Sequence, residues 1–188
     1  REFREKDDTT PVLLMGYANP VEHMGHAVFA DAAAEAGLDA LLTVDIPPEE
    51  VSGINTELQR VGLDNIFLVA PTTPDARIER IASEASGFIY YVSLKGVTGA
   101  GHLDADDVAN HVARIRKHSS LPVAVGFGIK DASSAASVAG VADGVVVGSA
   151  LIRAMADTLE SGADIQSAQD AAVGLLAEIR EGVDSVTS

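Results

Sequence analysis

Six short apolar segments recur along the chain, and each is followed by a stretch with the spacing of an amphipathic helix. The segments are continuous runs of valine, leucine, isoleucine and aromatic residues, which is typical of strands buried on both faces of a parallel sheet. Regular alternation of strands and helices indicates repeated βα units and an α/β fold. The pattern predicts strands at residues 12–15, 40–44, 66–69, 88–92, 123–125 and 144–147.

Residues that favour helix ends support this division. Gly37 follows an alanine-rich amphipathic stretch and predicts its carboxyl end. Pro48, followed by two glutamates, predicts the start of the next helix. Aspartate accepts hydrogen bonds from the first amides of a helix, so it marks helix starts. Further starts are predicted at Thr73–Asp75, Asp104, Asp131, Ala150 and Asp164.

The composition narrows the possible classes of protein. We expect residues 1–188 to form a single domain, since 188 residues is an ordinary domain length. A net charge of −15 opposes general binding to nucleic acid. No apolar run is long enough to cross a membrane, no signal peptide is visible and no cysteine is present, so a cytoplasmic location fits. The opening residues, from Arg1 to Lys6, read as the tail of a helix, and we expect the natural start to lie upstream.

Three glycine-containing turns follow buried strands: Gly96-Val97-Thr98-Gly99, Gly126-Phe127-Gly128 and Gly148-Ser149-Ala150. Glycine lets the backbone approach a ligand closely, and the first amides of a helix point at anions. Each turn could simply end a strand or cap a helix. The last two together favour a phosphate site, and the first suits a lid over a phosphorylated substrate.

Two architectures compete for this pattern, a doubly wound sheet and a (β/α)8 TIM barrel. No Gly-x-Gly-x-x-Gly follows an early strand, which weakens the dinucleotide-binding version of the first. Phosphate-type turns after the last two strands favour the barrel. Only six of its eight strands are predicted. We therefore expect an incomplete TIM barrel that covers roughly strands 3 to 8, with exposed edges at the Val12 and Val145 strands and poor stability alone.

Tyr17, Tyr90 and Phe127 fall at or near predicted strand ends and could form a slot for an aromatic ligand. Asp45 ends a strand and could be a general base, although a structural role is favoured. Glu22 is expected in a surface loop after Asn19-Pro20. The five histidines show no ligand spacing, so no metal is predicted.

Several segments, in order along the chain, together resemble the tryptophan synthase alpha subunit family. They are Leu13–Pro20, Val44–Pro47, Tyr90–Ser93 with Gly96–Gly99, Gly126–Ile129 and Val147–Ala150. The resemblance implies a (β/α)8 barrel lyase of tryptophan biosynthesis. Its reaction is the retro-aldol cleavage of indole-3-glycerol phosphate to indole and glyceraldehyde 3-phosphate, with no cofactor in the alpha subunit.

The resemblance also implies roles for residues of this chain. Thr98 would close over the site as part of the lid. Phosphate would be bound by Gly99, Gly126, Phe127, Gly128, Gly148 and Ser149. The indole ring would lie among Tyr17, Leu42, Leu68, Tyr90 and Phe127. Asn19, Pro20, Asp45 and Pro47 would face a pyridoxal-phosphate-dependent beta subunit in an alpha2-beta2 heterotetramer.

The glutamate and aspartate that catalyse the family's reaction lie on the family's second strand and the loop after it. This chain starts just before what resembles the third strand, so the resemblance places both acids upstream of Arg1. Neither acid is assigned to a residue of this sequence, so we expect the 188-residue chain to be inactive alone. Two alternatives stay open. One is another phosphate-binding barrel enzyme, a sugar-phosphate isomerase or epimerase. The other is a non-catalytic subunit that docks on the beta subunit.

Overall fold

The computed structural model describes residues 1–93, 105–126 and 128–186. It contains the six predicted strands, and their order in the sheet follows the chain, β1-β2-β3-β4-β5-β6. This confirms the α/β class. Each predicted strand is found within two residues of its expected position, because runs of apolar and β-branched residues favour the extended backbone. The strands are β1 (Leu13–Gly16), β2 (Ala40–Thr43), β3 (Asp64–Val69), β4 (Ile89–Val92), β5 (Val123–Gly126) and β6 (Gly144–Val146).

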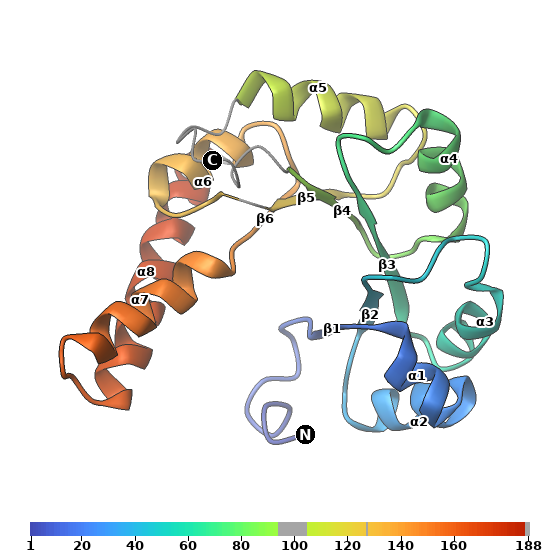
Figure 1. Cartoon of the computed structure of the whole chain (residues 1–188), viewed down its shortest axis with the longest axis horizontal. Coiled ribbons are helices and arrows are strands. Elements are labelled where there is room, and N and C mark those ends of the chain that lie inside the picture. Colours follow the sequence, from blue (N-terminus) through green and yellow to red (C-terminus); the bar gives the residue numbers. More distant parts are fainter. Residues whose placement is uncertain (94–104, 127, 187–188) are drawn as a thin grey trace. The chain divides into compact units, whose positions relative to one another are not determined.

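The chain divides into two compact units, which are described separately (Figure 1). The first contains residues 1–69 and 73–89, and the second contains residues 70–72 and 90–188. The expectation of a single domain over residues 1–188 stays a prediction.

In the first unit, β1, β2 and β3 pair in parallel, with Met15 beside Leu42 and Leu42 beside Ile66. Four helices connect or follow these strands: α1 (Ala18–Met24), α2 (His26–Glu35), α3 (Ser52–Arg60) and α4 (Asp75–Glu84). Strand β2 is buried along its whole length, as expected for a strand with a partner on each side. Leu13, Leu14 and Met15 of β1 are 40%, 43% and 55% exposed, which agrees with the exposed edge expected at this strand.

Two sequence-based expectations in the first unit are wrong. The segment around Asn19-Pro20, with Glu22, is the helix α1 and not a loop. Pro20 is tolerated because it lies in the first turn, where an amide would have no partner inside the helix. The helix expected to start at Pro48 starts instead at Ser52. Residues 48–51 form a turn before it.

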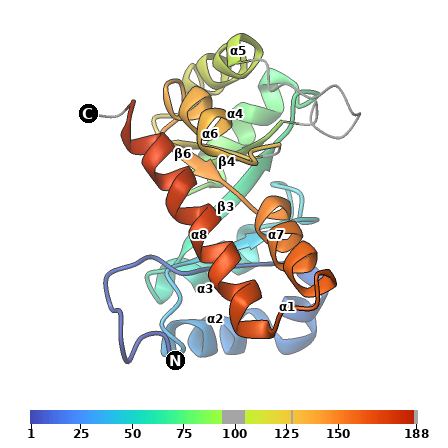
Figure 2. The ribbon, with the colours of Figure 1, turned by 90° about the vertical axis from the view of Figure 1, so that its left-hand side faces the viewer.

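In the second unit, β5 pairs in parallel with β6, with Gly126 beside Val146. Its helices are α5 (Ala105–Arg116), α6 (Ala132–Ala139), α7 (Ser149–Glu160) and α8 (Ile165–Asp184). The long helix α8 packs against α6 and α7, as Figure 2 shows. Asp131 and Asp164 cap α6 and α8 as predicted, each accepting a hydrogen bond from the backbone of the third helical residue. The expected cap at Asp104 lies outside the described residues.

Within the described ranges, no helix has the length and hydropathy needed to cross a bilayer.

Candidate functional site

The residues expected around an aromatic ring share one face of the sheet in the first unit. Asn65 of β3 donates from Nδ2 to Oδ1 of Asn55 in α3, at 2.6 Å, so its side of the strand faces the helix. Side chains alternate along a strand, and aligned residues of parallel neighbours point to the same side. Leu42, which aligns with Ile66, and Leu68, two residues further, therefore lie on the face away from α3.

Tyr17 belongs to the same face. It follows β1 directly with an extended backbone (φ −100°, ψ 156°), so it continues the alternation from Met15, which aligns with Leu42. The side chain of Tyr17 is 64% exposed, whereas Leu42 is fully buried. The first unit thus brings Tyr17, Leu42 and Leu68 to one face of its strands, with Tyr17 open at the carboxyl end.

The second unit repeats this arrangement at β4. The ring of Tyr91 stacks on His111 of α5, with centroids 5.2 Å apart, so Tyr90 points to the opposite face. Burial raises the pKa of the Tyr90 phenol, and it raises that of the fully buried Tyr91 to about 12, with a further contribution from Asp107. Both tyrosines are therefore neutral at physiological pH.

Tyr90 lies directly over the glycine turn expected to bind phosphate. A Cβ placed on Gly126 would be 2.7 Å from Cε2 and 2.8 Å from Cζ of Tyr90, and nearer still to its hydroxyl. Only glycine fits there without displacing the ring. The Gly126 carbonyl also accepts the amide hydrogen of Ser93, at 3.1 Å. The structure therefore brings together Tyr90, which was expected beside the indole ring, and Gly126, which was expected to bind phosphate.

The other half of the expected phosphate site is the start of α7. Gly148 is its N-cap, and Ser149 is its first residue and not the cap. Whereas α6 and α8 begin with capping aspartates, α7 has no side-chain cap and no acid in its first turn. Gly148 and Ser149 are exposed, and a Cβ on Gly148 would meet nothing within 4 Å. This helix start is open and its amides carry partial positive charge.

Gly128 completes the described part of the turn after β5. Its φ of +78° lies in the left-handed region that favours glycine. The next helix, α6, is fixed by a capping box between Asp131 and Ser134. The hydrogen bonds from Ser134 hold the pKa of the Asp131 carboxyl below its usual range. Phe127, together with the lid residues Thr98 and Gly99, lies outside the described residues.

The residues expected to face a partner lie in the first unit. Asn19 and Pro20 are in α1, and Asp45 and Pro47 follow β2. Asp45 Oδ1 accepts the amide hydrogen of Ala18 at 2.7 Å, which ties the segment after β2 to the start of α1. The carboxylate thus has a structural role, as the sequence favoured. It holds the first amide of α1. The described residues contain no group of three or more His, Asp or Glu arranged to hold a metal ion.

Sequence reasoning missed a buried polar network between β3 and α3, on the opposite side of the strands from Leu42 and Leu68. Asn55 is 7% exposed and Asn65 is 3% exposed. Asn55 Nδ2 donates to the backbone carbonyl and to Oε2 of Glu84, both at 3.1 Å. The backbone of Asn65 is held by Ser86, whose hydroxyl accepts the Asn65 amide hydrogen at 2.9 Å. The signal in the sequence was weak, since Asn65 lies directly before the predicted apolar strand at 66–69 and next to a second polar residue, Asp64.

Parallel βα repeats, with an open helix start after β6, define an α/β protein of a kind consistent with the TIM-barrel fold. Within that class, the chain belongs to the tryptophan synthase alpha chain family, which it matches over residues 1–181.

Individual relatives agree with this membership. The chain is 52% identical over 188 residues to the tryptophan synthase alpha chain of Thiobacillus denitrificans, covering 99% of this chain and 66% of the relative. It is 56% identical over 184 residues to that of Thioalkalivibrio sulfidiphilus, covering 98% and 68%. The chain thus spans about two thirds of the length of these relatives.

Solved structures give the same result. The tryptophan synthase alpha chain of Legionella pneumophila matches with a TM-score of 0.87 and 41% identity, over 100% of this chain and 68% of that one. The A-subunit from Pyrococcus furiosus matches with a TM-score of 0.81 and 30% identity, over 96% and 70%. Family members are lyases of tryptophan biosynthesis, and the alpha subunit carries no cofactor of its own.

Proposed function

We propose that this chain binds the phosphate and the indole ring of indole-3-glycerol phosphate for retro-aldol cleavage to indole and glyceraldehyde 3-phosphate. The observation that carries the proposal is the open start of α7 at Gly148 and Ser149. This helix follows β6, which is paired with β5, the strand that ends at Gly126. With a net charge of −15, an anion needs such local amide donors. The phosphate ligands would be Gly99, Gly126, Phe127, Gly128, Gly148 and Ser149, with Thr98 in the lid.

The ring would lie against the strand face away from α3 in the first unit and against the face of β4 that carries Tyr90 in the second. Tyr17, Leu42 and Leu68 supply one part of the apolar surface, and Tyr90 and Phe127 supply another. The six strands would correspond to strands 3 to 8 of the family's (β/α)8 barrel, which agrees with a match that covers all of this chain and 68% of a Legionella structure. Neither catalytic acid of the family is assigned to this sequence, so its residues bind and orient the substrate.

The expected partner is a tryptophan synthase beta subunit, which would hold pyridoxal phosphate and use the indole. We propose an alpha2-beta2 assembly in the cytoplasm, with Asn19, Pro20, Asp45 and Pro47 on the alpha side of the contact. The hydrogen bond from Ala18 to Asp45 supports this, because it keeps two of the proposed contact segments together. A sugar-phosphate isomerase would need Asp45 as its base, and that carboxylate is used structurally.

A titration tests the proposal. Indole-3-glycerol phosphate and glycerol 3-phosphate would be titrated into the 188-residue chain while the amide signals of Gly126, Gly148 and Ser149 are followed by NMR. We expect both ligands to shift these signals and the indole compound to bind more tightly. Equal affinities would argue against the ring slot, and unshifted glycine amides would argue against the phosphate site.

Gly148 offers a matched pair of variants for the same titration. A side chain there meets nothing within 4 Å, so Gly148→Ala should fold and bind nearly as the wild type does. Gly148→Asp places a negative charge at the helix start and should weaken glycerol 3-phosphate binding by roughly tenfold. If both variants bind alike, the anion is not held at this helix.

A further inference from the structure

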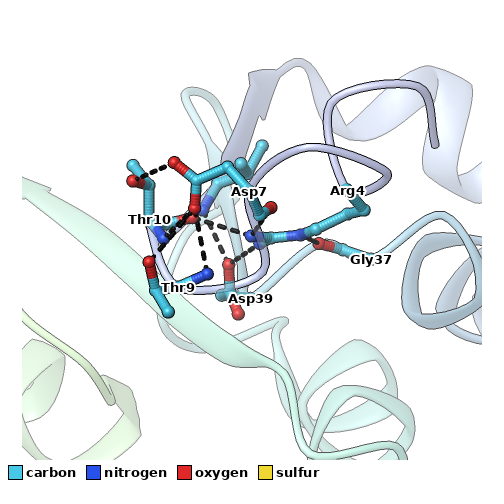
Figure 3. A network of polar contacts seen from close by, with 7 residues as sticks. Arg4, Asp7, Thr9, Thr10, Gly37 and Asp39 are labelled. Atoms are coloured by element: carbon cyan, nitrogen blue, oxygen red, sulfur yellow. Dashed lines mark hydrogen bonds and ion pairs between the residues drawn. The ribbon is translucent and has the colours of Figure 1, made fainter.

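Each unit contains the same arrangement of an arginine and an aspartate at the amino ends of two paired strands. In the first unit, shown in Figure 3, Arg4 Nη2 pairs with Asp39 Oδ2, and Arg4 Nε donates to the Gly37 carbonyl at 2.7 Å. The same aspartate oxygen accepts the Val12 amide hydrogen at 2.6 Å. The Asp39 amide donates back to the Val12 carbonyl at 2.9 Å. We call this arrangement the first strand clamp.

The second strand clamp repeats these bonds. Arg116 Nη2 pairs with Asp143 Oδ2 at 2.9 Å, and Arg116 Nη1 donates to the Val141 carbonyl at 3.3 Å. Asp143 Oδ2 accepts the Val123 amide hydrogen at 2.8 Å, and the Asp143 amide donates to the Val123 carbonyl at 3.0 Å. In both clamps the arginine contacts the carbonyl two residues before the aspartate. A Pro-Val pair, Pro11-Val12 or Pro122-Val123, leads into the strand whose first amide region the aspartate holds.

The two clamps act on strands that differ in burial and in the number of paired neighbours. Strand β2, after Asp39, is fully buried and is paired with both β1 and β3. Strand β6, after Asp143, has three half-buried residues, ends the strand order and pairs with β5 through three aligned positions. A short, partly exposed strand with one neighbour is the kind whose register is weakly specified. Strand β1, held by the first clamp, also ends the strand order and is exposed, so both clamps act on a pair that contains an edge strand. Only the second clamp acts on strands that are followed by the glycine turns at Gly126 and Gly148.

The register of β5 and β6 decides how the phosphate turns are placed. Gly126 ends β5, and Gly148 follows β6 by two residues. A slip of one residue would move Gly148 by about 3.3 Å relative to Gly126 and reverse the side chains of β6. A carboxylate that holds the first amide of β5, and is itself held by an arginine at the end of α5, opposes that slip.

We propose that Arg116 and Asp143 are positioning residues for the phosphate site: they fix β6 against β5 so that the turns at Gly126 and Gly148 reach one anion together. This rests on the proposed function of those turns. The hydrogen bonds of the clamp also act on the Asp143 carboxyl. Its partial burial acts to raise the pKa, but the bonds from Val123 and Arg116 lower the pKa below its usual value.

The test compares the two clamps in the full chain. Asp143→Asn and Arg116→Lys weaken the second clamp, and Asp39→Asn and Arg4→Lys are the matched changes in the first. Each variant is titrated with glycerol 3-phosphate well below its melting temperature, while the amides of Gly126, Gly148 and Ser149 are followed. We expect all four variants to have lower melting temperatures than the wild type. Only the second-clamp variants should show shifted signals of these amides in the absence of ligand, and only they should bind glycerol 3-phosphate roughly tenfold more weakly.

The outcomes separate the two proposals. If the wild type itself shows no glycerol 3-phosphate binding at these amides, the proposed phosphate site fails. If the wild type binds and the second-clamp variants bind with equal affinity, or if the first-clamp variants lose affinity to the same degree, the clamp has only a structural role and the inference is overturned. Should Asp143→Asn fail to fold, Arg116→Lys, which keeps the charge, decides the result.

Discussion

The backbone of Gly182 in α8 lies directly against the carbonyl group of Ala132, the first residue of α6. A Cβ on Gly182 would be 2.8 Å from the carbonyl carbon of Ala132 and nearer still to its oxygen. Because this neighbour is backbone, it cannot rotate away as a side chain could. This contact fixes the start of α6, the helix that follows the glycine turn after β5.

Substitution of Gly182 should therefore destabilise the second unit. We expect Gly182→Ala to lower the free energy of unfolding by about 1–3 kcal/mol, through overpacking that exceeds the gain in helix propensity. Gly174→Ala in the same helix is the control, since nothing lies within 4 Å of a Cβ there. It should be neutral or stabilising by up to about 1 kcal/mol. Urea denaturation of both variants measures the difference, and equal stabilities would contradict the contact.

A second prediction concerns Gly126 and the ring of Tyr90. Gly126→Ala would force a methyl group into the ring, at a cost of about 1–3 kcal/mol in unfolding free energy. Gly144→Ala in the paired strand is the control, because its nearest neighbour, the Cβ of Ala124, is 3.4 Å away. In a Tyr90→Ala background the Gly126 substitution should cost much less. A double-mutant cycle that gives no coupling between these positions would contradict the packing.

The buried asparagine network gives a third prediction. Asn55→Ala removes the partner of the Asn65 Nδ2 group, which is almost inaccessible to water. The variant should lose about 1–3 kcal/mol of stability, the usual effect of leaving a buried polar group unsatisfied. Thr56→Ala, the next residue, changes an exposed hydroxyl that bonds within the helix and should have an effect of less than about 0.5 kcal/mol. Similar losses at the two positions would show that burial of the network contributes nothing.

Acid should weaken the segment before β1 through Asp7. Its carboxylate accepts hydrogen bonds from the hydroxyl and amide of Thr10 and from Thr9, which lower its pKa from 3.8 to about 2. Since the folded value lies below the unfolded one, this contribution is complete above about pH 5 and is lost as the pH falls toward 2.

Melting temperatures measured between pH 2 and 7 check this sign. Asp7→Asn should melt below the wild type at pH 7, and the difference should shrink on acidification. Asp8→Asn removes the neighbouring charge and leaves the Asp7 turn intact, so it serves as the control. A difference between Asp7→Asn and the wild type that grows toward pH 2 would reverse the expected sign.

The sequence predicted the strands well because they are encoded locally. Val123 and Val125, for example, lie in a continuous β-branched run that has few alternatives to a buried strand. The aspartate caps at α6 and α8 are equally local. Helix α1 was missed because Asn19-Pro20 reads as a loop, and only the position of the proline within the first turn permits a helix.

Features that join distant residues could not be predicted in this way. Arg4 and Asp39 are 35 residues apart and Arg116 and Asp143 are 27 apart, and neither spacing follows a helix or strand period. The signal that was available is the repeat itself, a Pro-Val pair preceded by an arginine in both units. Likewise, Tyr90 and Gly126 were expected near each other only as members of a site, and their direct packing depends on the register of β4 and β5.

The last prediction separates binding from catalysis. The resemblance assigns neither of the family's two acids to this sequence, and the carboxylate of Asp45 is bonded to the Ala18 amide. Without a group to protonate the indole ring carbon and remove the glycerol hydroxyl proton, carbon–carbon cleavage loses its acid–base steps.

We expect the 188-residue chain to bind indole-3-glycerol phosphate but to release no indole above the uncatalysed rate. Indole release would be measured at saturating substrate, with Gly148→Asp as the control for site-dependent turnover. Steady cleavage by the wild-type chain that Gly148→Asp abolishes would show that this sequence contains its own catalytic acid, and it would direct the search to carboxylates at the strand ends.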